Sequence, residues 1–388
     1  MPEILRFDPS ACRFPSPRVP LLPAPRWRAL AGAGADRVPP GVLDGPGVRR
    51  YARGRYALQA ACAAAGLGPG GVLLAPSYHC RTILDPALAL GAGVALYPLH
   101  ADLRPDLDAI EALLGETGAA ARVLLVPHYF GIEQPAETME RLAALCRRHG
   151  LLLVEDCAHA WMTAQRRVEA GVPAGHVVVA SPYKYFACPD GGMLWGDPAR
   201  LPPRPRARSL LDEARAARAL AAASTTALPA ATPAAPAPDA VARGSEWRGR
   251  DDRPSHYYDA ALERRDALLL SRALIRHARP QAIAAQRRAR YRQWAAGTSA
   301  LARAQALAPA VSENCAPYMF PLLITHPDPD FFRLKQAGLP IWRWDDMAVS
   351  GCPVAADYRT RLLHLPCHQD LSDAQMDWML ALAREVLA

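Results

Sequence analysis

Lysine is almost absent from this sequence of 388 residues. Only two of its 45 basic residues are lysines, Lys184 and Lys335, and all the others are arginines. Arginine supplies positive charge as lysine does, but it keeps its proton near neutral pH and therefore cannot attack a carbonyl carbon. Lys184 follows an apolar run at 177–180 and precedes an Asp-Gly-Gly turn at 190–192, which places it at a strand end. We therefore predict a Schiff-base lysine at 184; the alternative is an ordinary surface lysine.

The sequence also lacks a long apolar run. No stretch reaches the length of a membrane span, and the first residues, Met1 to Arg6, lack the apolar core of a signal peptide. Nine cysteines occur without a Cys-x-x-Cys pair, which favours reduced thiols over a disulfide framework or a metal site. We expect a cytoplasmic protein with no metal site and no membrane partner.

Positive charge is plentiful, with a formal net charge of +8. The densest basic cluster, at 286–292, lies in a predicted helix over about 280–296 and lacks the aromatic or zinc-finger spacing of nucleic-acid-binding proteins. We interpret this cluster as a solvated helix face and expect no nucleic-acid partner.

Apolar runs alternate with helical patterns in the first half of the chain. The runs at 72–75, 94–97, 123–126 and 151–154 are separated by helical patterns at 82–90, 106–114 and 136–149. This alternation predicts an α/β fold with a parallel, doubly wound sheet. Further helices are expected at 206–223 and 260–275, a strand at 318–324 and a last helix at 372–386, which indicates a smaller C-terminal α/β domain. The expected units are an N-terminal arm at 1–45, a large domain at 46–242 with an Ala/Pro-rich loop at about 224–240, and a small domain at 243–388, with ordered structure starting near Val48.

Polar and aromatic side chains follow three of these predicted strands, at 72–75, 123–126 and 151–154, and also the apolar run at 177–180. In an open α/β sheet, ligands bind at the carboxyl ends of the strands. Pyridoxal phosphate (PLP) needs a lysine for its aldehyde and a carboxylate facing its ring nitrogen, and Lys184 and Asp156 supply both. Asp156 has capping of the next helix as its alternative role, and for His128 a core position is as open as a substrate contact. The residues at these ends are Tyr78 and His79, His128 and Tyr129, Asp156 and His159, and Lys184.

A phosphate site is predicted at Gly54, which precedes a helical run at 57–65. Free N–H groups and the dipole at the start of a helix attract anions. Ser181 offers a hydroxyl group as an additional donor.

Several motifs together resemble the DegT/DnrJ/EryC1/StrS family. The match is carried by Val-Glu-Asp-Cys-Ala-His-Ala at 154–160, by Ser181-x-x-Lys184, and by Pro-Asp-Gly-Gly at 189–192. It extends to Ala-Pro-Ser-Tyr-His at 75–79, Val-Pro-His-Tyr-Phe-Gly at 126–131 and the stretch at 365–372. The resemblance implies a fold-type-I PLP enzyme, usually an aminotransferase acting on a nucleotide-linked keto sugar, and a homodimer that shares its active sites. It further implies that His159 lies near the phenolic oxygen of the cofactor, that Tyr78 or His79 lies on its ring face, and that the segment Gly54, Arg55 and Tyr56 lies at its phosphate.

The chain departs from the family at two places. Arg55 and Tyr56 follow Gly54 where the family has a Gly-Thr or Gly-Ser pair. The family also carries an Asn/Arg motif near 255–259 that reaches the neighbouring subunit, whereas Asn314 is the only asparagine here. Tyr257, Tyr258 or His256 is a candidate replacement, and the candidate substrate contacts are His128, Tyr129, Tyr257 and Tyr258.

The leading interpretation is an aminotransferase that moves an amino group from an amino acid to a keto sugar or a similar carbonyl compound. Lysine at 184 favours it over the dehydratase branch of the family, which has histidine there. Two alternatives remain open: a PLP enzyme for decarboxylation, elimination or carbon–carbon bond chemistry, and a non-catalytic member of the family.

Overall fold

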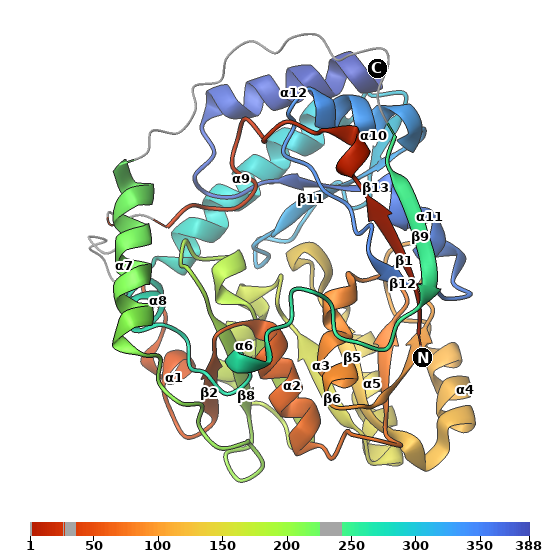
Figure 1. The fold of residues 1–388 in the computed structure, drawn as a ribbon, viewed down its shortest axis with the longest axis vertical. Coiled ribbons are helices and arrows are strands. Elements are labelled where there is room, and N and C mark those ends of the chain that lie inside the picture. The colour runs from red at the N-terminus through yellow and green to blue at the C-terminus, as the bar shows by residue number, and fades with distance from the viewer. Residues whose placement is uncertain (1, 26, 28–35, 226–242) are drawn as a thin grey trace.

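A seven-stranded sheet forms the centre of the larger part of the molecule (Figure 1). The computed structural model describes residues 2–25, 27, 36–225 and 243–388. The strand order is β2-β8-β7-β6-β5-β3-β4; β3 to β7 run parallel, and β8 is antiparallel to both of its neighbours. The strands are β2 (Val48–Tyr51), β3 (Val72–Pro76), β4 (Gly93–Tyr97), β5 (Ala121–Pro127), β6 (Leu152–Asp156), β7 (His176–Ala180) and β8 (Gly192–Gly196). The predicted α/β class and parallel strands are therefore confirmed.

Both faces of this sheet are buried, which explains why its strands read as continuous apolar runs. In β3, Leu73 packs into the cluster that contains α2 and α3, whereas Leu74 packs into the cluster that contains α4 and α5. Helix α6, which follows β6 in the sequence, packs against β7. The helices are α2 (Gly54–Ala64), α3 (Asp85–Ala89), α4 (Leu107–Thr117), α5 (Ala136–His149) and α6 (Trp161–Ala170).

A second, antiparallel sheet lies in the upper half of the view in Figure 1. It consists of β10 (Ala304–Ala306), β11 (Met319–Ile324) and β13 (Leu362–Pro366). Its apolar core is shared with α9 (Pro280–Thr298), α10 (Pro327–Gln336) and α12 (Asp373–Leu387), and α11 (Pro353–Arg361) packs against β11 and β13. Ser372 and Gln375 form a capping box at the start of α12, near the predicted helix start.

The first residues of the chain belong to a third sheet. Strand β1 (Glu3–Asp8) pairs antiparallel with β9 (Ser245–Arg250) and with β12 (Met347–Ala348), and Ile4 is fully buried. Ordered structure thus begins at β1 and not near Val48. The partners of β1 lie far along the chain, so no local pattern in the N-terminal segment revealed them.

The helix expected at 260–275 is only half right. The chain forms a short turn, η7 (Ala260–Leu262), and then α8 (Leu269–His277). Between them, the backbone of Arg265 forms an isolated parallel β-bridge with that of Arg206, and the N–H of Leu268 donates to the carboxylate of Asp190. These tertiary contacts hold the backbone extended where helix propensity alone favoured a helix.

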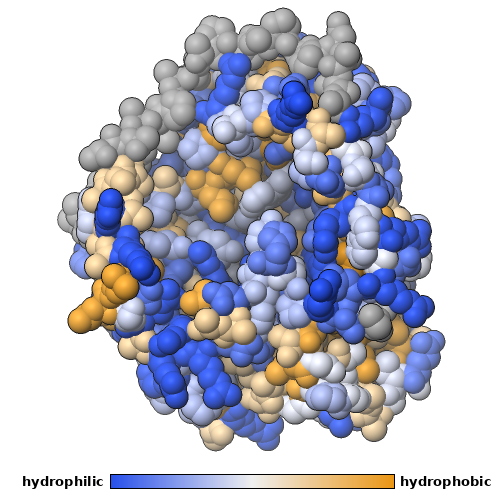
Figure 2. Space-filling model, in the orientation of Figure 1, coloured by the Kyte–Doolittle hydropathy of each residue, from blue (hydrophilic) through white to orange (hydrophobic). Residues whose placement is uncertain are grey.

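The helix expected at 206–223 appears as α7 (Leu210–Thr225), and most of the Ala/Pro-rich loop, from 226 to 240, lies outside the described residues. Apolar residues gather on the surface at the start of α7, where Leu210 and Leu211 are exposed; much of the rest of the face in Figure 2 is hydrophilic. Within the described ranges, the helices are too short or too polar to cross a membrane.

Candidate active site

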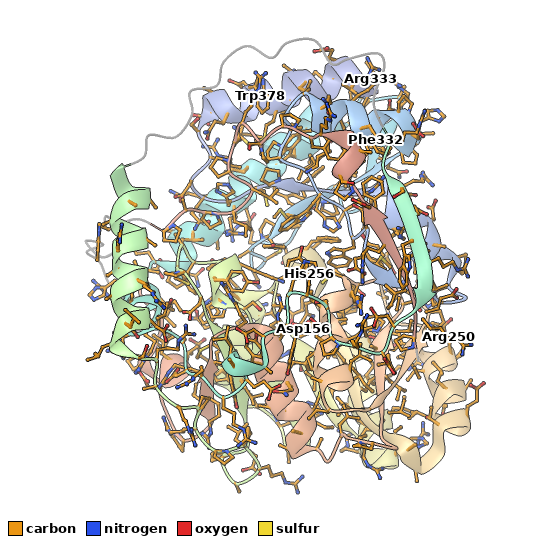
Figure 3. The ribbon with its side chains drawn as sticks, viewed as in Figure 1. Asp156, Arg250, His256, Phe332, Arg333 and Trp378 are labelled. Carbon is orange, nitrogen blue, oxygen red and sulfur yellow. The ribbon has the colours of Figure 1, made fainter. Side chains whose placement is uncertain are left out.

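A pocket of about 490 Å³ opens where β6 and β7 end. Figure 3 shows Asp156 near the middle of the molecule, at the edge of the large sheet that faces the small one. The lining residues are Arg53, Gly54, Arg55, Leu58, His79, Cys80, Thr82, Ile83, Asp156, Ala158, Val179, Ser181, Tyr183 and Lys184. The pocket thus brings together six of the residues singled out in the sequence: Gly54, Arg55, His79, Asp156, Ser181 and Lys184.

Lys184 ends the turn η6 (Pro182–Lys184), which follows β7 directly. Its N–H donates to the carbonyl of Ser181 at 3.0 Å, so the turn presents the side chain at the sheet edge. The Nζ atom lies 5.5 Å from the centre of the Tyr318 ring, and Lys184 forms no ion pair with a described residue. The amino group is therefore not tied up by a carboxylate.

Asp156 is the last residue of β6, and it is 7% exposed. One oxygen of its carboxylate accepts from the N–H of Ala158 at 2.8 Å, which fixes the orientation of the group. Helix α6 begins only at Trp161 and has no side-chain cap. Asp156 therefore does not cap the next helix, and its carboxylate lines the pocket instead.

Helix α2 points its first turn into the pocket, and no side chain caps this end. A Cβ atom on Gly54 would lie 2.2 Å from Ser181 Oγ, so only glycine lets the helix start approach this hydroxyl. Arg55 is held by the buried Asp85, with 3.3 Å between Nη1 and the carboxylate. Arg53 lies over the Tyr183 ring at 4.4 Å. Two guanidinium groups, a helix N-terminus and a hydroxyl thus surround one place suited to an anion.

His79 forms an aromatic wall of the pocket. Its ring stacks on Trp344 at 4.5 Å with an interplanar angle of 24°. Burial lowers the pKa of His79 to about 4, so the ring is neutral at physiological pH. A neutral imidazole can pack against the positively charged pyridinium ring of PLP without electrostatic repulsion.

This set of groups fits PLP. The cofactor needs an amine, a carboxylate for the ring nitrogen, an aromatic or apolar face and donors for its phosphate. Lys184, Asp156 and His79 meet the first three needs, and the start of α2 with Ser181, Arg53 and Arg55 meets the fourth. Position 54 has room only for glycine because the start of α2 lies so close to the Ser181 hydroxyl. This close approach places the expected phosphate donors side by side.

Three of the expected cofactor residues do not line the pocket. Tyr56 is buried and accepts from the N–H of Asp259. Tyr78 is fully buried, and its hydroxyl meets His364 Nε2 at 3.1 Å. His159 stacks on Tyr318 at 4.3 Å, and burial lowers its pKa well below the usual value. We assign these side chains to the support of the pocket.

The expected substrate contacts divide into two groups. His128 is buried between the N–H of Gln134 and the carboxylate of Glu155, and Tyr129 donates to the carbonyl of Tyr78; both are core residues. Tyr258 donates to Glu263, whereas Tyr257 is 61% exposed and lies against His256. Only Tyr257 and His256 remain available at the surface.

Several lining residues were not predicted from the sequence, among them Arg53, Cys80, Thr82, Ala158 and Tyr183. Cys80 Sγ lies 3.0 Å from Thr82 Oγ1. Arg53 stands next to Gly54 and was recognisable as part of the anion site. Trp344 and Tyr318 come from the second half of the chain and had no local signal.

The fold defines the class of protein: it is that of fold-type-I PLP enzymes. Similar solved structures include DesV from S. venezuelae in complex with a ketimine intermediate, which is 20% identical with a TM-score of 0.61 over 92% of this chain and 93% of DesV. The sugar aminotransferase CalS13 from Micromonospora echinospora is 19% identical, with a TM-score of 0.59 over 94% and 99% of the two chains. A putative sugar aminotransferase from Streptococcus pneumoniae in its PMP form is 13% identical, with a TM-score of 0.61 over 95% and 97%.

A family model matches the part of the sequence that forms most of the large sheet and its helices. Residues 51–206 match the model of the DegT/DnrJ/EryC1/StrS aminotransferase family. This match confirms the resemblance seen in the motifs, which is to a family of aminotransferases.

Proposed function

We propose that this protein transfers an amino group from an amino acid to a nucleotide-linked keto sugar, and that Lys184 forms the Schiff base with the cofactor. One observation carries the proposal: a single pocket contains the amine of Lys184, the carboxylate of Asp156 and the phosphate donors around Gly54. When bound, PLP supplies an electron sink that stabilises negative charge on the carbon next to the amino group.

The chain's own residues hold the cofactor and move the proton. The carboxylate of Asp156 keeps the ring nitrogen protonated, because an adjacent negative charge favours the charged form of a base. The phosphate is bound by the first N–H groups of α2 together with the side chains of Ser181, Arg53 and Arg55. The amino group of Lys184 would move the proton at the donor carbon, as a general base and then a general acid.

The choice of a sugar acceptor is supported by the family match and by the two sugar aminotransferases among the similar structures. We further propose a cytoplasmic homodimer in which the loop around His256 and the exposed Tyr257 faces the partner's site. Sedimentation of the protein as a monomer would contradict the dimer.

The test compares visible absorption spectra of the wild type, Lys184→Ala and Lys335→Ala after addition of PLP. We expect a bound-cofactor band in the wild type and in Lys335→Ala that is lost in Lys184→Ala. The band should bleach with an amino donor such as glutamate and return with the correct keto sugar.

Other results separate the alternatives. Release of carbon dioxide or ammonia from the donor would indicate decarboxylation or elimination. A protein that never binds PLP would contradict the enzyme proposal and leave a binding role.

A further inference from the structure

Arg287 lies in the middle of α9 and is fully buried, although the sequence predicted a solvated basic face there. It forms no ion pair with a described residue. Instead its guanidinium donates to four neutral oxygens: Gln369 Oε1 at 2.9 Å and the carbonyls of Pro317 at 3.1 Å, Lys184 at 3.1 Å and Tyr185 at 3.0 Å.

Such a charge is expensive to bury. Burial lowers the pKa of Arg287, and only a full set of hydrogen bonds offsets the loss of water around a guanidinium. The Tyr185 ring, 4.9 Å from the guanidinium carbon, adds a cation–π contact, and Gln369 Nε2 donates to the same Tyr185 carbonyl at 3.2 Å. A hydrophobic side chain here would leave these four oxygens without a donor, so the fork of donors ties together the segments that carry them.

The four acceptors belong to three separate segments. Lys184 and Tyr185 follow β7 of the large sheet, Pro317 precedes β11 of the small sheet, and Gln369 follows β13. Pro317 is followed directly by Tyr318, whose ring lies 5.5 Å from Lys184 Nζ. One guanidinium therefore fixes the backbone of the lysine and the backbone that carries the ring beside its amino group.

We propose that Arg287 is a positioning residue for Lys184. It sets the lysine against the Tyr318 ring by holding both main chains at once, and it couples this arrangement to the small sheet. The inference rests on the proposed role of Lys184. Because the guanidinium of Arg287 contacts Lys184 at its main-chain carbonyl, it acts through the backbone and takes no part in the proton transfer.

The scarcity of lysine makes a direct test possible. In the full-length wild-type chain freed of PLP, the amino groups open to acetic anhydride are those of Lys184, Lys335 and the N-terminus, and mass spectrometry of the peptides gives each rate. Each arginine-to-lysine variant below adds one lysine, at the substituted position, which is followed as a separate site. In Arg287→Lys we expect the rate at Lys184 relative to Lys335 to rise about threefold, because the amino group loses its contact with the Tyr318 ring. Arg292→Lys, on an exposed part of the same helix, is the matched control and should leave the ratio unchanged.

The PLP-bound protein gives a second readout. In Arg287→Lys, kcat should fall on the order of tenfold with little change in the donor KM, since a misplaced base affects the chemical step more than binding. The midpoint of the pH titration of the visible band should also shift relative to the wild type and Arg292→Lys.

A second variant, Gln369→Ala, keeps the test decisive if the Arg287 variant misfolds. Gln369 lies in a loop, and its truncation removes one acceptor of Arg287 and one donor to the Tyr185 carbonyl. We expect the same direction of change at Lys184 with a smaller size. If both variants fold with an unchanged labelling ratio and an unchanged visible titration, Arg287 has a purely structural role and the inference is wrong. If PLP does not bind at Lys184 at all, the proposed function fails, whereas the labelling ratio still decides the inference.

Discussion

Gly54 and Ser181 approach so closely that a Cβ atom on Gly54 would lie 2.2 Å from Ser181 Oγ. Replacing Gly54 by alanine forces the start of α2 and the serine apart, although alanine is the better helix former. We therefore predict that Gly54→Ala weakens PLP binding about tenfold, in line with the usual cost of overpacking a closed site. Titration of the cofactor-free protein with PLP, followed by its visible band, measures this change.

Two variants serve as controls for the clash. Gly115→Ala, in an open position of α4, should leave PLP affinity unchanged and stabilise the helix by up to about 1 kcal/mol. In a Ser181→Ala background the clash is removed, so the added Gly54→Ala should have little further effect. An equal tenfold loss in both backgrounds would show that steric contact with Ser181 is not the cause.

Asp85 is fully buried and holds Arg55 in the pocket wall. Its two oxygens accept from Ser255 N–H at 2.7 Å, from Ser255 Oγ at 2.8 Å and from Arg55. An amide has one acceptor oxygen for these three donors. We predict that Asp85→Asn lowers the free energy of unfolding by about 1–3 kcal/mol and weakens PLP binding, because Arg55 loses its anchor. Urea unfolding and PLP titration measure the two effects.

The comparison for this change is Asp102→Asn, which breaks an ion pair with Arg104 that is about half exposed. It should change neither quantity by more than about 0.5 kcal/mol. If the Asp85→Asn variant is destabilised but binds PLP with normal affinity, Arg55 does not contribute to cofactor binding.

The stability of the cofactor-free protein should fall in mild acid, and His79 contributes to this. Burial lowers the pKa of His79 to about 4, whereas a histidine in the unfolded chain titrates near about 6.5. Between these values the unfolded chain binds a proton that the folded chain does not, so the free energy of unfolding decreases as pH falls from about 6.5 to about 4. We predict that His79→Phe, which keeps a neutral ring against Trp344, loses less stability over this range, by up to a few kcal/mol.

Urea unfolding at pH 8 and pH 5 tests the prediction. The remaining slope in His79→Phe belongs to other buried histidines, such as His364, whose pKa burial lowers to about 3. The exposed His149 is the control, since His149→Gln should follow the wild type at both pH values. Parallel losses of stability in the wild type and His79→Phe would mean that His79 already titrates near its ordinary pKa in the fold.

Local signals in the sequence were sufficient to predict the parallel strands and the position of Lys184 and Asp156 at their ends. Lys184 and Asp156 each follow a continuous apolar run, and such runs predict buried strands whose carboxyl ends share one edge. Gly54 precedes a strong helix, which is again a local pattern. The regular part of the site could therefore be predicted without coordinates.

The sequence left His128 open between a core position and a substrate contact, named Tyr129 as a candidate substrate contact, and predicted a solvated face around Arg287. All three side chains are buried, and the sequence could not show this for a common reason. Each residue type suits both a functional surface and a core, and the choice depends on partners elsewhere in the chain. The Nε2 atom of His128 lies 3.2 Å from the carboxylate of Glu155, and the Tyr129 hydroxyl donates to the carbonyl of Tyr78. Arg287 donates to acceptors on three segments. A basic cluster at 286–292 does not reveal by itself that one member points inward.

The sequence by itself predicted the fold class, the family resemblance and the positions of Lys184 and Asp156 at neighbouring strand ends, because strand and helix periodicity and short motifs depend on neighbours along the chain. Only the tertiary structure decided which aromatic rings line or support the pocket, that β1 joins β9 and β12, and that Arg287 reaches the backbone of Lys184. Those contacts join residues far apart in sequence, and their energy comes from burying groups together, which no single stretch of the chain encodes.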